Sequence, residues 1–157
     1  MNKWLHIGLV AGGLVLADQI IKLGVNEWVA PLGRVRVIPG FFNLTYVQNT
    51  GVAFGMFAGS YSTARLLLLA ALAITALAVI LFFIHKAGEN EPLFIWGLSF
   101  ICGGAVANQI DRIYKSGAVV DFLDFYLGSV HWPVFNLADV GITVGTGMII
   151  LHLWRTR

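Results

Sequence analysis

The chain has 157 residues, of which 58% are hydrophobic and only 11% are charged. A soluble domain carries about 25% charged residues, so this composition excludes an ordinary soluble protein and indicates a membrane protein. The formal net charge of +2 gives no reason to expect a nucleic-acid partner. The single cysteine, Cys102, excludes an intrachain disulfide and a cysteine-based metal site, and no metal or other cofactor is expected.

Four apolar segments are each long enough to cross a bilayer, which needs about 20 residues. They cover residues 5–25, 64–84, 93–114 and 133–154. The first is too long for the apolar core of a signal peptide and has no cleavage site after it, so we expect it to be retained. We predict an all-α polytopic membrane protein, with residues 1–157 as a single membrane domain and four transmembrane helices.

Two long loops, 26–63 and 115–132, lie on the side of the membrane opposite to the termini. The first contains a run of alternating arginine and valine, 34–37, and a run rich in aromatic and β-branched residues, 41–47, with a Pro-Gly pair between them. This pattern predicts a small antiparallel sheet on the membrane surface, between the first two helices. The second loop is expected to lie half-buried at the interface. Lysine and arginine are distributed equally on the two sides, so charge alone does not predict the orientation.

The strongly polar residues of the predicted spans all fall toward the side of the two long loops. These residues are Asp18 and Lys22 in the first span, Asn108, Asp111 and Arg112 in the third, and Asn136 and Asp139 in the fourth. Such one-sided placement predicts one functional site at that end of the bundle. Asp18 and Lys22 are four residues apart on one helix face, so a purely structural ion pair is an equally simple interpretation. Arg112 has the alternative of extending to lipid phosphate.

Asp121 and Asp139 are the predicted catalytic pair. Carboxylates near hydrocarbon are costly and therefore indicate function. Two carboxyl groups that share a site hold one proton between them, so one activates a water while the other polarises a peptide carbonyl. Asp124 is the alternative to Asp121, although a solvated loop carboxylate is the simpler interpretation of Asp124.

The segment of residues 49–55 ends the first long loop. Gly51 and Gly55 allow backbone conformations that other residues avoid. Asn49 offers both a donor and an acceptor to a peptide backbone. By itself the segment is compatible with any turn, and the glycine-rich residues 51–59 predict mobility between the sheet and the second span.

Five stretches, taken in order, resemble the lipoprotein signal peptidases, the bacterial signal peptidase II family. They are Asp18-x-x-x-Lys22, Asn49-Thr50-Gly51-Val52-Ala53-Phe54-Gly55, Gly103-Gly104-Ala105-x-x-Asn108-x-x-Asp111-Arg112, Val119-Val120-Asp121-Phe122 and Phe135-Asn136-Leu137-Ala138-Asp139. Each stretch is a weak signal alone, but five in the family's order, combined with four spans, are specific.

The resemblance implies an aspartic endopeptidase of the bacterial cytoplasmic (inner) membrane, with its site toward the periplasm and a periplasmic β-cradle. The implied substrate is a diacylglyceryl-modified prolipoprotein, which is cut immediately before its lipidated cysteine. Catalysis would fall to Asp121 and Asp139. The residues implied to bind substrate or support that pair are Asp18, Lys22, Asn49, Gly51, Asn108, Arg112 and Asn136. Membrane lipid is the other expected partner, and the protein is expected to be a monomer.

Two residues depart from the family pattern. Ala107 stands where the family commonly has glycine, and we expect a slightly wider helix contact there. Val140 stands where a serine is usual, so one hydrogen bond near the predicted pair is expected to be missing. Asp111 matches the pattern, but neither its neighbours in sequence nor the resemblance assigns it a role.

Three other functions stay open from the residues alone. A small proton-coupled transporter would use membrane carboxylates as a relay. Transporter sites, however, lie near the midplane between internal repeats, and no repeat is visible here. A serine protease would use Lys22 as its base with Ser60, Ser62, Ser116 or Ser129 as nucleophile. A non-catalytic membrane assembly protein is the third alternative.

Overall fold

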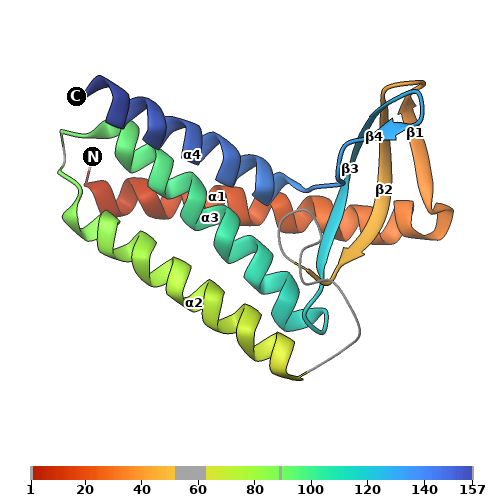
Figure 1. The fold of residues 1–157 in the computed structure, drawn as a ribbon, viewed down its shortest axis with the longest axis horizontal. Coiled ribbons are helices and arrows are strands. Elements are labelled where there is room, and N and C mark those ends of the chain that lie inside the picture. Colours follow the sequence, from red (N-terminus) through yellow and green to blue (C-terminus); the bar gives the residue numbers. More distant parts are fainter. Residues whose placement is uncertain (1, 52–62, 89, 157) are drawn as a thin grey trace.

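The computed structural model describes residues 2–51, 63–88 and 90–156. Within these residues, four long helices form a bundle, and a four-stranded antiparallel sheet lies at one end of it (Figure 1). Both termini lie at the other end of the bundle. Each of the four helices is long and apolar enough to cross a membrane, so the expected number of spans is confirmed for this part of the chain.

The helices are α1 (Lys3–Gly24), α2 (Thr63–Lys86), α3 (Pro92–Tyr114) and α4 (Leu137–Arg155). Helix α3 lies centrally and packs most extensively against α4 and α1. Glycine allows this close approach, because a Cβ added at Gly97 would lie only 2.8 Å from the carbonyl oxygen of Gly145. Ala107, on α3, is fully buried.

The first helix extends further than the sequence indicated. After α1 the chain continues helically through η1 (Val25–Val29), which is a π-helix, and η2 (Ala30–Leu32), which is a 3₁₀-helix. Pro31 lies in the first turn of η2, where its missing N–H costs no hydrogen bond. Gly33, with a φ of +71°, ends the helical run.

The fourth helix begins later than expected, at Leu137 instead of residue 133. Asn136 has extended backbone geometry, and its side chain accepts the N–H of Asp139 while the Asp139 carboxylate accepts the N–H of Asn136. This capping box fixes the start of α4. Phe135, just before it, pairs with Leu123 in the sheet.

The sheet has the order β1 (Arg34–Ile38), β2 (Phe42–Asn49), β3 (Val119–Leu127) and β4 (Val130–His131). The expected strands before the second helix are present. The other two strands come from the second long loop, where no strand was expected, so the all-α description is incomplete. Val120 and Phe122 on β3 form a buried cluster with Val25 and Val29 of η1, and this cluster fixes the sheet against the extension of α1.

Candidate active site

Asp121 and Asp139 lie where the sheet meets the helices. Asp121 comes from β3, and Asp139 comes from the first turn of α4. Asn136 links them, because its side-chain amide donates to Asp121 Oδ1 (2.7 Å) and its backbone N–H donates to Asp139 Oδ2 (3.2 Å). Asn136 is fully buried, so the two carboxylates share one rigid neighbour.

A second asparagine holds Asp121 from the neighbouring strand. The Asn49 amide donates to Asp121 Oδ2 (3.0 Å), while its own oxygen accepts the N–H of Gly51 (2.9 Å). The pairing of β2 with β3 places Asn49 opposite Val119, two residues before Asp121. Asn49 is therefore oriented by Gly51 so that its amide group faces the carboxylate.

A third asparagine holds Asp139. The Asn108 amide, on α3, donates to Asp139 Oδ1 at 2.9 Å. The Asn108 oxygen accepts from Lys22 Nζ and from the Asn136 amide, both at 3.2 Å. These two donors determine which end of the Asn108 amide faces Asp139.

The environment raises the pKa of the Asp121 carboxyl group. Burial is the main cause; hydrogen bonds from Asn49 and Asn136 oppose it, and the negative charge of Asp139 reinforces it. The resulting pKa is about 6. Two neighbouring carboxyl groups, one of which keeps its proton to nearly neutral pH, are suited to acid–base chemistry on a water molecule.

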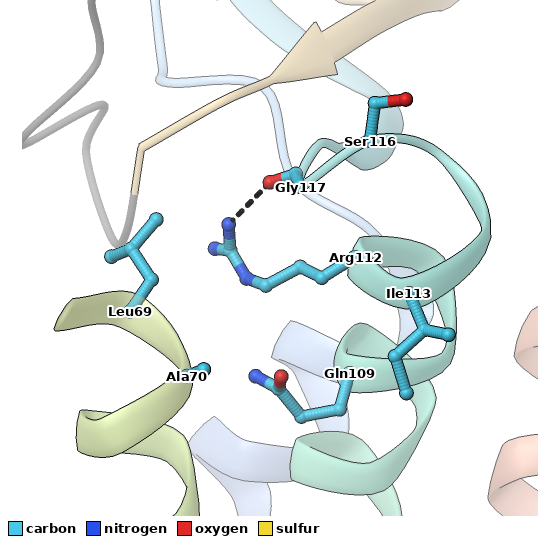
Figure 2. Close-up of a pocket in the computed structure, with 7 residues that line it drawn as sticks. All are labelled: Leu69, Ala70, Gln109, Arg112, Ile113, Ser116 and Gly117. Atoms are coloured by element: carbon cyan, nitrogen blue, oxygen red, sulfur yellow. Dashed lines mark hydrogen bonds between the residues drawn. The ribbon is translucent and has the colours of Figure 1, made fainter. Parts of the chain in front are cut away.

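Arg112 connects the end of β2 to the turn before β3. Its guanidinium donates to the carbonyl oxygens of Gly51 and Gly117, the latter at 2.8 Å. Figure 2 shows Arg112 and Gln109 pointing from α3 toward α2, into a pocket. The pocket is also lined by Leu69, Ala70, Ile113, Ser116 and Gly117. The guanidinium binds two protein carbonyl groups, which favours the supporting role over a lipid phosphate contact.

Three buried ionic residues lie behind the pair. Lys22 Nζ is 2.7 Å from Asp18 Oδ2 and 2.9 Å from Asp111 Oδ2, and each of the three side chains is at most 1% exposed. The ion pair expected between Asp18 and Lys22 is therefore present and includes Asp111 as well. Gln19, which sequence reasoning missed, donates to both Asp18 and Asp111 at 3.3 Å. Its position beside Asp18, late in the first span, was the available signal.

Asp124 lies in a separate cluster on the sheet. It accepts hydrogen bonds from the Asn43 amide (2.8 Å) and pairs with His131 Nδ1 (2.6 Å). Its side chain is 2% exposed, so the interpretation as a solvated loop carboxylate is wrong. Burial alone would raise the pKa of Asp124, but hydrogen bonds from His131 and Asn43 lower it below its ordinary value.

Several expectations concern residues that are not described. Residues 52–55 of the glycine-containing segment, the remainder of the 51–59 stretch, and both Ser60 and Ser62 lie outside the described residues. In the described part of the chain, no group of three histidine, cysteine, aspartate or glutamate side chains is placed to hold a metal ion. Lys22 is held by two carboxylates and by Asn108, which gives no support to its role as the base of a serine protease.

Comparison with known proteins identifies the family. The family model for signal peptidase (SPase) II matches residues 10–155. A lipoprotein signal peptidase from Maridesulfovibrio salexigens is 38% identical over 157 residues, which is 100% of both chains. One from Oleidesulfovibrio alaskensis is 42% identical over 155 residues, covering 99% of this chain and 98% of the relative. One from Burkholderia mallei is 42% identical, covering 100% of this chain and 91% of the relative.

Solved structures agree with this result. A bacterial membrane enzyme superposes with a TM-score of 0.82 at 29% identity, over 96% of this chain and 88% of the other. A second has a TM-score of 0.80 at 30% identity, over 94% of this chain and 92% of the other. With matches of this length in both sequence and structure, the chain belongs to the signal peptidase II family.

Proposed function

We propose that this protein is an aspartic endopeptidase that removes the signal peptides of diacylglyceryl-modified prolipoproteins, with Asp121 and Asp139 as its catalytic pair. Membership of the signal peptidase II family supports the removal of signal peptides from prolipoproteins. The observation that carries the aspartic mechanism is the shared contact of Asn136 with both carboxylates.

The pair holds one proton before the reaction. The ionised carboxylate takes a proton from a water molecule as the water oxygen attacks the scissile carbonyl carbon, and the protonated carboxyl group donates a hydrogen bond to the carbonyl oxygen. When the tetrahedral intermediate collapses, the C–N bond breaks and a proton passes from the pair to the departing amine. The reaction needs no nucleophilic side chain, and the two carboxyl groups return to their starting state.

The location of the pair suits a lipidated substrate. Asp121 belongs to β3 and Asp139 to the first turn of α4. The sheet and the start of α4 meet at one end of a bundle of four helices that are apolar enough to span a membrane (Figure 1). We infer that the substrate enters sideways from the bilayer, with its acyl chains remaining in lipid. The scissile bond, immediately before the lipidated cysteine, then reaches the pair at the periplasmic face of the inner membrane.

The supporting side chains hold the pair and the substrate backbone. Asn49, Asn108 and Asn136 donate to the carboxylates and keep them aligned. Arg112 holds the backbone of Gly51 near the site, so the end of β2 is available to contact an extended peptide. A proton relay, as in a transporter, would instead need polar groups near the middle of the helices.

The test is cleavage of a purified diacylglyceryl-modified prolipoprotein by the purified protein in detergent, beside the unlipidated form. We expect cleavage of the lipidated form alone, before its modified cysteine, and loss of that cleavage in Asp139→Asn. Glu91→Gln is the matched control, since Glu91 is a carboxylate that directly precedes α3. The start of α3 lies at the end of the bundle that holds the termini, away from the sheet (Figure 1). Normal cleavage by a folded Asp139→Asn variant would contradict the assignment of the pair.

A further inference from the structure

Two buried carboxylates behind the catalytic pair make contacts of the same kind. Asp18 Oδ1, on α1, accepts the backbone N–H of Ala138 at 3.0 Å. Asp111 Oδ2, on α3, accepts the backbone N–H of Val120 at 3.0 Å. Ala138 immediately precedes Asp139, and Val120 immediately precedes Asp121. Each carboxylate therefore holds the backbone of the residue next to one member of the pair.

One ammonium group joins these two carboxylates. Lys22 Nζ lies 2.7 Å from Asp18 and 2.9 Å from Asp111, so it fixes the separation between them. Gln19 adds a second bridge by donating to the same two side chains. Lys115 approaches Asp111 from a more exposed position, at 3.3 Å, and supplies the second positive charge of the cluster.

The backbone groups involved have no access to water. Ala138 and Val120 are both fully buried, so an unpaired N–H at either place would lose its hydrogen bond without replacement. Ala138 lies in the first turn of α4, where backbone N–H groups have no partner within the helix. The Asp18 carboxylate supplies that partner from another helix.

We propose that Asp18, Lys22 and Asp111 form a clasp that sets the distance between Asp121 and Asp139, with all three acting as positioning residues. The clasp fixes β3 through Val120 and α4 through Ala138, and Lys22 joins the two halves. Lys22 also donates to Asn108, which donates to Asp139, so the clasp orients that carboxylate as well. The effect of the clasp on catalysis rests on the proposed function. The clasp also gives a role to Asp111, to which the sequence alone assigned none.

Hydrogen exchange tests the clasp without any substrate. We expect Asp111→Ala to accelerate exchange of the Val120 amide and Asp18→Ala that of the Ala138 amide, each by about tenfold, as for the loss of one hydrogen bond. Lys22→Met should accelerate both. The corresponding asparagine variants keep an acceptor oxygen and should show a smaller change, which keeps the test valid if an alanine variant does not fold.

Glu91→Gln is the matched control, because Glu91 also accepts a backbone N–H, that of Gly88, at the other end of the bundle. It should leave exchange at Val120 and Ala138 unchanged. Equal exchange at both amides in wild type and in the clasp variants would overturn the proposal. So would acceleration spread evenly over the bundle, because that result describes a general loss of stability.

Cleavage kinetics test the positioning role. In folded Asp18→Ala and Asp111→Ala we expect kcat to fall by about a hundredfold, as for a small displacement of reacting groups, with KM little changed. The asparagine variants should lose less, because they keep an acceptor oxygen. Removing either negative charge should also move the pH profile of kcat to lower pH, because Lys22 is then less neutralised. A wild-type kcat and pH profile in both alanine variants would overturn the proposal. A wild-type protein that cleaves nothing would contradict the proposed function instead, and hydrogen exchange would then decide the clasp alone.

Discussion

Strand β3 carries two buried aspartates three residues apart, and their surroundings have opposite effects. Asp121 faces amide donors and a second carboxylate, and its pKa rises to about 6. Asp124 faces an amide donor and the ring of His131, and its pKa falls below the ordinary value. The partners that the fold brings to each carboxylate, and not burial alone, thus separate a group suited to proton transfer from one suited to holding a sheet together.

Replacing each aspartate by asparagine tests this contrast most strongly. Asp121→Asn removes a group that transfers protons in the proposed reaction, so we expect cleavage of the lipidated substrate to fall by about a thousandfold. Asp124→Asn should keep nearly all of the activity when the cleavage rates of both variants are expressed per folded molecule. Initial rates in detergent measure both. Comparable losses in the two variants would mean that Asp124 has a part in the chemistry.

The asparagines that hold the two carboxylates extend the comparison. Asn136→Ala removes the cap of α4 and a donor to Asp121, so we expect kcat to fall and the free energy of unfolding to decrease by about 1–2 kcal/mol. Asn43→Ala removes the matching donor to Asp124 and should reduce stability by a similar amount without changing kcat. Thermal unfolding and cleavage rates, measured on the same preparations, separate the two effects. Equal kcat losses would contradict the division between the clusters.

The pH dependence of stability should have opposite signs at the two sites. The lowered pKa of Asp124 means that its contribution is present above the unfolded pKa of about 3.9 and is lost as pH falls through the lower folded value. The raised pKa of Asp121 means the reverse: stability present below about 3.9 is lost as pH rises through about 6. Unfolding midpoints of the wild type and of each asparagine variant, compared from acid to neutral pH, measure these differences. If the unfolding midpoints of the wild type and of both variants changed with pH in parallel, the assignments of a raised pKa to Asp121 and a lowered pKa to Asp124 would both be contradicted.

The smallest effect is expected at His131, which is 39% exposed and stacks on Tyr126. His131→Phe keeps the stacked ring but removes the contact with Asp124. We expect a loss of about 1 kcal/mol in unfolding free energy, with cleavage unchanged. A change in kcat would show that the Asp124 cluster is coupled to the pair. Tyr126→Phe is the matched variant, because it keeps the ring and removes only the hydrogen bond from Gly40.

The sequence predicted the starts of two helices well. Helices α2 and α3 begin within one residue of their expected starts. Pro92 is the first residue of α3, a position where the missing N–H of proline costs no hydrogen bond. Helix α4 differs, since Asn136 and Asp139 cap each other and set the start at Leu137. The extension of α1 through η1 was missed, because its buried face appears only when Val25 and Val29 meet β3.

Strand β3 and its partners were the hardest features to predict. Its two aspartates interrupt the apolar pattern, and their partners come from distant segments: Asn43 and Asn49 on β2, and Asn136 before α4. The polar residues themselves were visible at one end of the predicted spans. Which of them meet, and that Gln19 belongs with them, depends on tertiary contacts that spacing along the chain does not contain.

The double use of Asn136 has a consequence for biosynthesis. The residue starts α4 and also holds Asp121, so the start of the last helix and one contact of the candidate site depend on the same side chain. During synthesis, α1, α2, α3 and all four strands of the sheet are made before Asn136 emerges. In the proposed function, the site is therefore complete only after the last span has been made, so the order of synthesis sets the moment at which the protein can become active.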